Sequence, residues 1–325
     1  MVQTNLVVGL DISKKTFDVA LPLGEGYSHK QYGNDLTGFR QLLQDLPANA
    51  WCIMEATGPY YLRLATFLHA NKVSVSVVNP LVIKRFSQMR LLRAKTDRAD
   101  ARMIASYGKT EQPPLWQPNA GWIMELQQFE AVLEQYGRQR TALLNQTEAF
   151  TQSGISSKKA LTIIKQSLRH LDKQIASVEK LIEQLVNQQH ADLLQRLSTI
   201  PGIGNKTAIT LIVITGGFVK FSNAKQISSY IGLCPRIVES GTSVKGKSRI
   251  CKLGMSRIRR LLYLCSWSAI KCNRACKQMY QRLVARGKPR MIALIAVANK
   301  LLKQAFAIAK SNDIYQENFQ LNICF

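Results

Sequence analysis

The stretch Leu6-Val7-Val8-Gly9-Leu10-Asp11 is a short apolar run that ends in an acid. Such a run predicts a buried β-strand that delivers a carboxylate at its carboxyl end. The stretch Trp51-Cys52-Ile53-Met54-Glu55 repeats the pattern, and residues 73–78 form a third apolar segment. Alternating residues on both sides of Gly24-Glu25-Gly26 predict that a hairpin follows the first strand. With helical spacing in the connecting segments, this order predicts an α/β domain built on a mixed sheet.

Two of these predicted strands end in the acids Asp11 and Glu55. The carboxyl ends of strands are where α/β folds place their sites, although a single acid there is more often a turn residue or a helix cap. The other acids of the region, Asp18, Asp35 and Asp45, are interpreted as solvated or turn residues.

A second pair of acids lies in Lys95-Thr96-Asp97-Arg98-Ala99-Asp100-Ala101-Arg102, which has the character of a helix. Residues i and i+3 share a helical face, so Asp97 and Asp100 are predicted to point at one spot. Two carboxylates held close favour a bound cation, and hard oxygen ligands select Mg²⁺. An exposed helix face with alternating charges is the alternative. The strand-end acids Asp11 and Glu55 favour the interpretation as a metal site.

The 325-residue chain has a formal net charge of +24, which is unevenly distributed. Residues 201–325 contain 21 Lys and Arg against 3 Asp and Glu, residues 111–200 contain 9 of each kind, and residues 1–110 contain 14 against 8. Such a field attracts phosphate backbones through counterion release, which predicts nucleic acid as the partner. A membrane surface is the weaker alternative, because the cations interleave with Gly, Ser and Cys instead of lining one side of an amphipathic helix.

Seven cysteines at irregular spacings predict no disulfide framework and fit a reducing cytoplasm. Zinc is not expected, because no second His or Cys pair at ligand spacing matches Cys272 and Cys276. The N-terminal residues lack the order of a secretory signal, and the apolar run 291–298 is too short to span a bilayer.

The middle of the chain carries a heptad pattern. Its apolar positions step alternately by three and four residues: Leu161, Ile164, Leu168, Leu171, Ile175, Val178, Ile182 and Leu185. Apolar a and d positions sustained over more than three heptads predict a coiled coil, within the chain or between chains. With zero net charge, this region is interpreted as structural, holding subunits of a homo-oligomer together.

The third region opens with Leu197-Ser198-Thr199-Ile200-Pro201-Gly202-Ile203-Gly204-Asn205-Lys206-Thr207-Ala208. A helix is predicted to stop at Pro-Gly and another to restart after Gly204. Two glycines allow a tight turn that aims the free N–H groups of the new helix outward, which suits a phosphate oxygen. This pattern is similar to a helix-hairpin-helix, a clamp on the DNA backbone, and a plain helix-loop-helix corner is the alternative.

Residues 232–249 are predicted to be a loop in which Ser and Thr alternate with Gly and cations. This mixture suits either phosphate binding or a hydroxyl nucleophile surrounded by positive charge. The pattern does not choose among Ser240, Thr242, Ser243 and Ser248. The residues predicted to contact nucleic acid in this third of the chain are Gly202, Gly204, Lys206, Arg236, Lys245, Lys247, Arg249, Lys252 and Arg257.

Six motifs resemble, in order along nearly the whole chain, the DEDD-type insertion-sequence transposases whose relatives include the pilin-gene DNA invertases. They are Gly9-Leu10-Asp11-Ile12-Ser13-Lys14, Met54-Glu55-Ala56-Thr57-Gly58-Pro59-Tyr60, Val78-Asn79-Pro80, Lys95-Thr96-Asp97-Arg98-Ala99-Asp100-Ala101, Ile200-Pro201-Gly202-Ile203-Gly204 and Glu239-Ser240-Gly241.

The resemblance implies a RuvC-like catalytic domain of the RNase H fold at 1–112, a coiled-coil region at 113–196, and a mainly α C-terminal transposase domain at 197–325. It further implies that Asp11, Glu55, Asp97 and Asp100 bind Mg²⁺ and that Ser240 is the nucleophile. The expected partners are donor and target DNA, a non-coding guide RNA that pairs with both, and further copies of the chain in a dimer or tetramer. The expected location is the prokaryotic cytoplasm, without a membrane partner.

Two other functions share part of this evidence. A junction-resolving nuclease would use the same acids with water and need no serine. A non-catalytic nucleic-acid-binding protein would fit the charge, but four acids converging near a polyanion would weaken such a binder.

Overall fold

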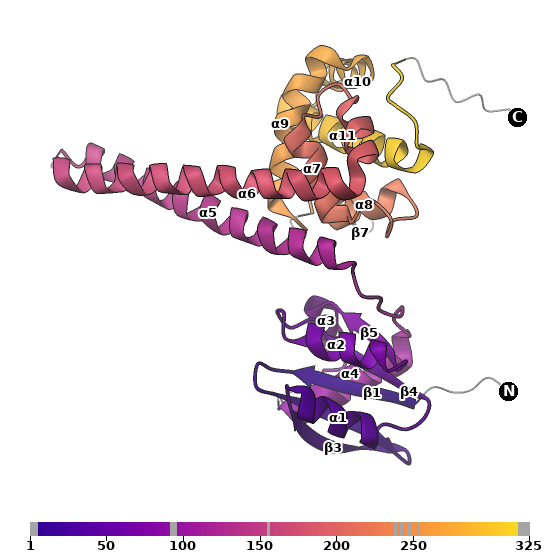
Figure 1. Cartoon of the computed structure of the whole chain (residues 1–325). Helices are drawn as coiled ribbons and strands as arrows, with labels where there is room; N and C mark the ends of the chain where they lie inside the picture. Colours follow the sequence, from indigo (N-terminus) through magenta and orange to yellow (C-terminus); the bar gives the residue numbers. More distant parts are fainter. Residues whose placement is uncertain are drawn as a thin grey trace, which may run out of the picture. The chain divides into compact units, whose positions relative to one another are not determined.

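The computed structural model describes residues 6–91, 96–154, 157–236, 239–240, 244–245, 249–251 and 254–317. It divides the chain into two compact units, Met1–Asn119 and Ala120–Phe325. The long helices of the middle region belong to the second unit (Figure 1). The three predicted regions 1–112, 113–196 and 197–325 stay a prediction about domains.

The first unit is built on a five-stranded sheet with the strand order β3-β2-β1-β4-β5. Strands β1 and β2, and β2 and β3, are antiparallel, whereas β4 is parallel to both β1 and β5. The mixed sheet predicted from the apolar runs is therefore confirmed. Its strands are β1 (Leu6–Ile12), β2 (Thr16–Leu23), β3 (Gly26–Gly33), β4 (Ala50–Glu55) and β5 (Ser74–Val78), and its helices are α1 (Leu36–Asp45), α2 (Tyr61–Ala70), α3 (Pro80–Met89) and α4 (Asp97–Glu111).

Different helices cover the two faces of this sheet. On one face, Val8 and Leu10 of β1 are fully buried in a core shared with Phe39 of α1 and Leu64 of α2. On the other face, Ala20 of β2 packs with small residues of α4. Because side chains alternate along a strand, Asp11 lies on the α4 face.

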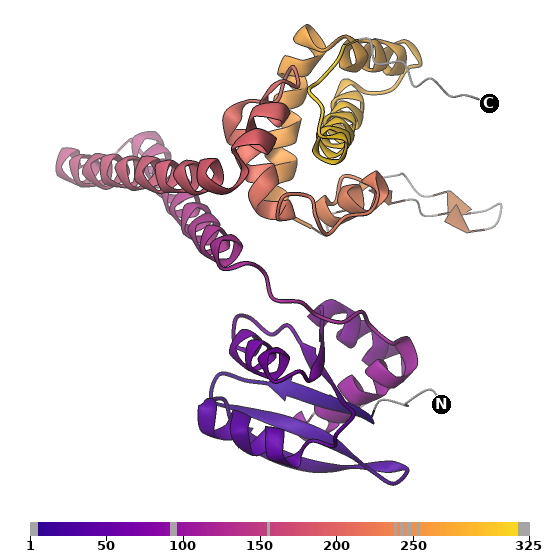
Figure 2. The same cartoon turned by 45° about the vertical axis from the view of Figure 1, so that its right-hand side comes forward.

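The described residues of the second unit are helical apart from turns and four two-residue strands. Its elements are α5 (Gly121–Gln152), α6 (Lys158–Ser198), α7 (Asn205–Thr215), α8 (Ala224–Ile231), β6 (Pro235–Arg236), β7 (Glu239–Ser240), β8 (Val244–Lys245), β9 (Arg249–Ile250), α9 (Ser256–Cys272), α10 (Arg274–Ala285) and α11 (Arg290–Ser311). Helices α9, α10 and α11 group with α7 and the C-terminal end of α6 (Figure 2). The core includes Leu197 of α6, Leu211 of α7, Leu262 of α9 and Leu301 of α11.

The heptad pattern of α6 has a partner within the chain. Helix α5 packs against α6 as a hairpin, burying Leu126 and Leu133 of α5 with Ile182 and Val186 of α6. The eight predicted a and d positions are all buried or half-buried. The heptad pattern therefore corresponds to a helical hairpin within the chain. Contacts between chains through these helices stay a prediction.

Helix α11 is long and apolar enough to cross a membrane, so the apolar run 291–298 belongs to a longer apolar helix than expected. Residues along one of its faces, from Leu294 through Leu301 to Ile308, are buried in the core of the second unit. This burial is what a core helix shows, and its apolarity is explained by packing.

Candidate metal centre and nucleic-acid surface

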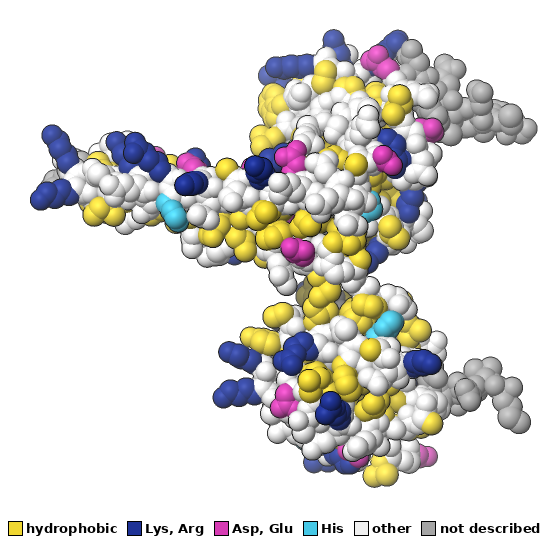
Figure 3. Space-filling view, in the orientation of Figure 1, with side chains coloured by type: hydrophobic (Ala, Val, Ile, Leu, Met, Phe, Trp, Pro, Cys, Tyr) yellow, Lys and Arg dark blue, Asp and Glu magenta, His cyan; other side chains and the backbone are white. Residues whose placement is uncertain are grey.

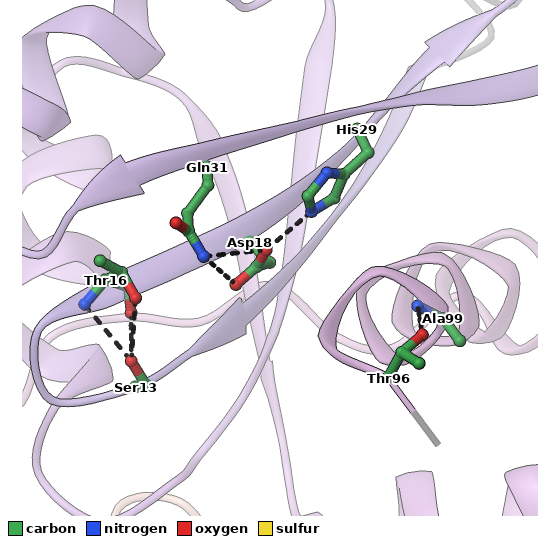
Figure 4. Close-up of polar contacts among 7 residues, drawn as sticks. All are labelled: Ser13, Thr16, Asp18, His29, Gln31, Thr96 and Ala99. Atoms are coloured by element: carbon green, nitrogen blue, oxygen red, sulfur yellow. Dashed lines mark hydrogen bonds and ion pairs between the residues drawn. The ribbon is translucent and has the colours of Figure 1, made fainter. Parts of the chain in front are cut away.

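The first turn of α4 carries two of the predicted site acids. Thr96 caps this helix, and its hydroxyl accepts a hydrogen bond from Ala99 N at 3.2 Å (Figure 4). The backbone oxygen of Thr96 accepts from Asp100 N at 2.8 Å. Asp97 and Asp100 therefore lie where the helix dipole favours negative charge.

Asp11 joins these two acids from the end of β1. One carboxylate oxygen of each of Asp11, Asp97 and Asp100 lies within 4.8 Å of the others, close enough for a single cation to contact all three. Asp97 is exposed, while Asp11 and Asp100 are half-buried. The i and i+3 spacing in α4 thus places both acids beside the strand-end acid.

Gly9 makes this approach possible. A Cβ at Gly9 would lie 2.1 Å from the backbone oxygen of Ala101 and 2.5 Å from the backbone nitrogen of Ala105. The backbone of α4 therefore rests directly on β1, two residues before Asp11. Any larger residue at this position would push the helix and its acids away from the strand.

Glu55 lies near this cluster but outside the group within 4.8 Å. It follows Met54, which pairs with Leu10 in the parallel register of β1 and β4, so Glu55 ends its strand beside the end of β1. Its Oε1 accepts a hydrogen bond from Thr57 Oγ1 at 3.3 Å. The structure thus brings three of the four predicted acids together and places the fourth close enough to raise the pKa of Asp11.

The pKa of Asp11 records this crowding. Burial, followed by the negative charges of Asp100, Glu55, Asp97 and Asp18, raises the pKa of Asp11 to about 6. Like charges held together in a partly buried site favour either a proton or a cation. Because all the donors are hard carboxylate oxygens, the cluster fits a divalent ion of the Mg²⁺ class.

Asp18 corrects one expectation from the sequence. It was expected to be solvated, but it is buried, and its carboxylate accepts hydrogen bonds from His29 Nε2 at 2.7 Å and from Gln31 Nε2 at 3.2 Å (Figure 4). The alternation of residues in the predicted hairpin could have indicated this burial, because it places Asp18 opposite Asp11 on the same face of the sheet. Asp35 is the N-cap of α1, in agreement with its expected turn role.

Ser240, the predicted nucleophile, lies in the second unit. Its backbone forms β7, and it pairs with Val244 of β8 in a short antiparallel ladder. The predicted contact residues Lys245, Arg236 and Arg249 lie on β8, β6 and β9. Two more of the predicted contact residues, Lys247 and Lys252, lie outside the described residues.

The predicted helix-hairpin-helix segment forms a turn between α6 and α7. Gly202 has a φ of +99°, and a Cβ there would lie 2.7 Å from the Cβ of Ala269 on α9. Gly204 is the N-cap of α7. The first glycine is therefore required by its own backbone conformation and by close packing against α9.

Two predicted phosphate contacts have acidic partners within the second unit. Lys206 forms an ion pair with Glu179 of α6, and Arg257 forms an ion pair with Glu130 of α5. Burial and the nearby Arg260 lower the pKa of Arg257. These pairs tie the helical hairpin to α7 and α9, and a role of either cation in binding nucleic acid stays a prediction.

Exposed cations surround the C-terminal helices. No Asp or Glu occurs between residues 241 and 312, and the exposed Lys and Arg side chains of α9, α10 and the turn after α10 include Arg260, Lys271, Lys277, Arg282, Arg286 and Lys288. This part of the chain has the electrostatic character of a nucleic-acid surface.

Residues 111–200 have zero net charge, yet one end of this region carries a cluster of exposed cations. Lys and Arg gather at the free end of the α5–α6 hairpin in Figure 3, where Lys158, Lys159, Lys165 and Arg169 are exposed. Glu179 and Glu183 lie on the same helix nearer the core, where they pair with Lys206 and Asn205. The sequence analysis missed this patch because it summed the charges over the whole region.

Two family models match successive parts of this chain. Residues 8–153 match a family model of DEDD-type IS110 transposases, and residues 194–281 match a model described as the transposase IS116/IS110/IS902 family. The pilin gene-inverting proteins of Moraxella lacunata and Moraxella bovis are each 32% identical over 326 residues, which cover 94% of this chain and 96% of theirs. The transposase for insertion sequence element IS1328 of Yersinia enterocolitica is 24% identical, covering 96% of this chain and 98% of the relative.

Proposed function

The chain belongs to the IS110 family of transposases and is a DNA recombinase or transposase, and from this premise we propose that it cleaves and rejoins DNA through a metal-bound acid tetrad and a serine nucleophile. The observation that carries the proposal is the cluster of Asp11, Asp97 and Asp100 within 4.8 Å. It lies in the segment that matches the DEDD transposases.

The DEDD domain implies a divalent metal, and we assign Mg²⁺ to it. The carboxylates of Asp11, Asp97 and Asp100 would hold the ion, with Glu55 as the fourth acid of the site. When bound, such an ion neutralises the charge that develops on the oxygens of the reacting phosphate. The acids themselves hold the ion and do not attack the DNA.

Ser240 is the proposed nucleophile. Its Oγ would form a bond to the phosphorus as one P–O bond of the DNA backbone breaks, and the hydroxyl proton would pass to the departing oxygen. The resulting phosphoserine link keeps the energy of the broken bond, so a hydroxyl of another strand can displace the serine and rejoin the DNA.

The fold supports further parts of this proposal. The antiparallel β1-β2-β3 meander, continued by the parallel strands β4 and β5, supports the proposal of a RuvC-like domain of the RNase H fold. The cations of α9 and α10 supply a surface for donor DNA, target DNA and a non-coding guide RNA. In this proposal base pairing by the RNA selects the sequence, and the protein supplies shape recognition and chemistry.

A covalent adduct tests the nucleophile. Suicide DNA substrates are expected to trap a protein–DNA link with the wild-type chain and not with Ser240→Ala. The neighbouring changes Thr242→Ala and Ser243→Ala are the matched controls and should leave the adduct in place. Cleavage that persists undiminished in Ser240→Ala would instead indicate a nuclease that uses water.

An independent change tests the acid cluster. Asp97→Asn is expected to abolish recombination while preserving nucleic-acid binding, because it removes a carboxylate from the cluster and no cation from the basic surface. A protein that only binds nucleic acid would be unaffected or would bind more tightly.

Sequencing the RNA that co-purifies with the chain tests the proposed guide RNA, which should contain segments matching both DNA partners.

A further inference from the structure

A polar network with a buried acid, Asp18, lies next to the proposed metal centre. Asp18 of β2 stands directly opposite Asp11 of β1 in the antiparallel register, and Gln31 of β3 stands opposite Asp18. His29 stands opposite Ala20, two residues along β3 from Gln31. Residues directly opposite one another share a sheet face, so the network lies on the same face as Asp11.

The oxygens of the Asp18 carboxylate are held by the edge strand. His29 Nε2 lies 2.7 Å from Oδ1, and Gln31 Nε2 lies 3.3 Å from Oδ1 and 3.2 Å from Oδ2 (Figure 4). The Asp18 side chain is only 9% exposed, whereas that of His29 is 27% exposed. The network therefore runs from solvent at β3 to a buried acid beside the cluster.

Burying the Asp18 carboxylate beside other acids costs free energy, through lost hydration and through repulsion. Asp18 is a fifth acid close to a group of four, and its charge adds to the repulsion that Asp11 already experiences. Burial of a charge is tolerated only where hydrogen bonds and an opposite charge offset the lost hydration. His29 and Gln31 supply those hydrogen bonds, and they leave Asp18 directed towards β3.

We propose that Asp18 is a positioning residue of the metal centre and that His29 and Gln31 hold its carboxylate out of the coordination sphere. This inference rests on the proposed function, because it assumes that Asp11 holds a metal ion. Held in this way, Asp18 keeps the β1–β2 frame rigid behind Asp11. Released, it would be a spare hard oxygen ligand beside a divalent cation.

Direct binding of Mn²⁺ to the full chain, measured by calorimetry or by electron paramagnetic resonance without nucleic acid, tests the proposal. His29→Leu removes the shortest hydrogen bond to the Asp18 carboxylate and leaves only the longer bonds from Gln31. It is expected to tighten Mn²⁺ binding about three- to tenfold, or to add a second bound ion. The same variant should recombine DNA more slowly at saturating metal, because the ion is displaced. The double variant His29→Leu/Asp18→Asn should lose the tighter binding.

Two further variants serve as controls. His29→Gln keeps an N–H donor towards Asp18 and should restore wild-type Mn²⁺ binding, which a general packing defect would not allow. His69→Leu changes a histidine of the same unit that also lies beside a glutamine, Gln117, at 3.1 Å, and should leave Mn²⁺ binding unchanged.

Several results would overturn the inference. Unchanged Mn²⁺ binding in His29→Leu, or tighter binding that survives the Asp18→Asn change, would show that His29 does not restrain Asp18. Loss of binding in Asp18→Asn as complete as in Asp97→Asn would make Asp18 a ligand. The proposed function fails separately, through normal Mn²⁺ binding in Asp97→Asn itself.

Discussion

At the scale of single residues, Asp11 stores unfavourable electrostatic energy in the ligand-free protein. Its carboxyl is half-buried and faces Asp100, Glu55 and Asp97, and its pKa is raised from 3.8 to about 6. The unfolded chain does not have this crowding, so its Asp11 ionises at the ordinary value. The folded state therefore binds a proton more tightly than the unfolded state between these two pKa values.

This difference predicts how stability depends on pH. Without a divalent metal, ionised Asp11 destabilises the fold above pH 6, and this cost fades as the pH falls towards 4, because the folded state takes up a proton first. Asp11→Asn should therefore have a higher Tm than the wild type at pH 7 in EDTA, with a difference that shrinks towards pH 4 to 5. Thermal denaturation across this range is the measurement.

Magnesium supplies the matching control at constant pH. Added Mg²⁺ at pH 7 should raise the Tm of the wild type more than that of Asp11→Asn, because a bound cation relieves the same repulsion. If the Tm difference between the wild type and Asp11→Asn is the same at every pH and metal concentration, the neighbouring acids do not destabilise ionised Asp11.

At the scale of elements, the contact between β1 and α4 positions the site. Gly9 lets the backbone of α4 approach, and Ala101 and Ala105 present the smallest side chains to the sheet. Sequence patterns predicted the strand and the helix separately. The absence of a side chain at Gly9 decides how closely the two approach.

Gly9→Ala should therefore impair both folding and function. The added methyl meets backbone atoms of α4 that cannot rotate away, so we expect a loss of about 1–3 kcal/mol in the free energy of unfolding. Recombination should fall further than stability explains, since α4 carries Asp97 and Asp100. Denaturant unfolding and strand-transfer assays measure the two effects.

The control for this change is Gly137→Ala in the middle of α5. Nothing lies within 4 Å of a Cβ at Gly137, so alanine should raise helix stability by up to about 1 kcal/mol and leave recombination unchanged. Equal behaviour of the two variants would contradict the role assigned to the contact at Gly9.

The pair Glu130–Arg257 is the corresponding contact in the second unit. It joins α5 to α9, and the two side chains are only 14% and 22% exposed. A half-buried guanidinium that loses its partner keeps its charge without compensation. The pair therefore contributes to the attachment of the helical hairpin.

Glu130→Gln is expected to reduce the free energy of unfolding by about 1–3 kcal/mol, because it leaves Arg257 without its charge partner. Glu134→Gln, on the same helix, removes the exposed pair with Arg138 and should change stability by less than about 0.5 kcal/mol. Thermal unfolding compares them, and a larger loss in Glu134→Gln would contradict this ranking.

At the scale of the whole molecule, the proposed chemistry is divided between the two compact units. The acids lie within Met1–Asn119, and Ser240 lies within Ala120–Phe325. Helices α5 to α8 and strand β6 lie between them along the chain. An active site completed by two copies of the chain is compatible with this order.

Complementation tests such a shared site. A mixture of Asp97→Asn and Ser240→Ala chains should regain recombination that neither variant shows alone, because one copy retains the acids and the other retains the serine. Each variant alone, at the same total concentration, is the control. Absence of rescue at every mixing ratio would place both halves of the site in one copy.

Local patterns in the sequence determined the parts of this protein that depend on neighbours along the chain. Apolar runs predicted β1 and β4 with their terminal acids, the heptad pattern predicted the long helix, and the excess of Lys and Arg in residues 201–325 predicted a basic C-terminal region. Strand alternation and helical spacing suffice for these, because each follows from the periodicity of a single element.

Only the tertiary structure decided which distant residues meet. It buried Asp18 beneath His29, gave Gly202 a packing role against α9, paired Arg257 with Glu130 and pressed α4 onto Gly9. Each of these depends on the register and the close approach of separate elements. Their energies arise from burial and charge between residues far apart in the chain, which periodicity along one segment does not encode.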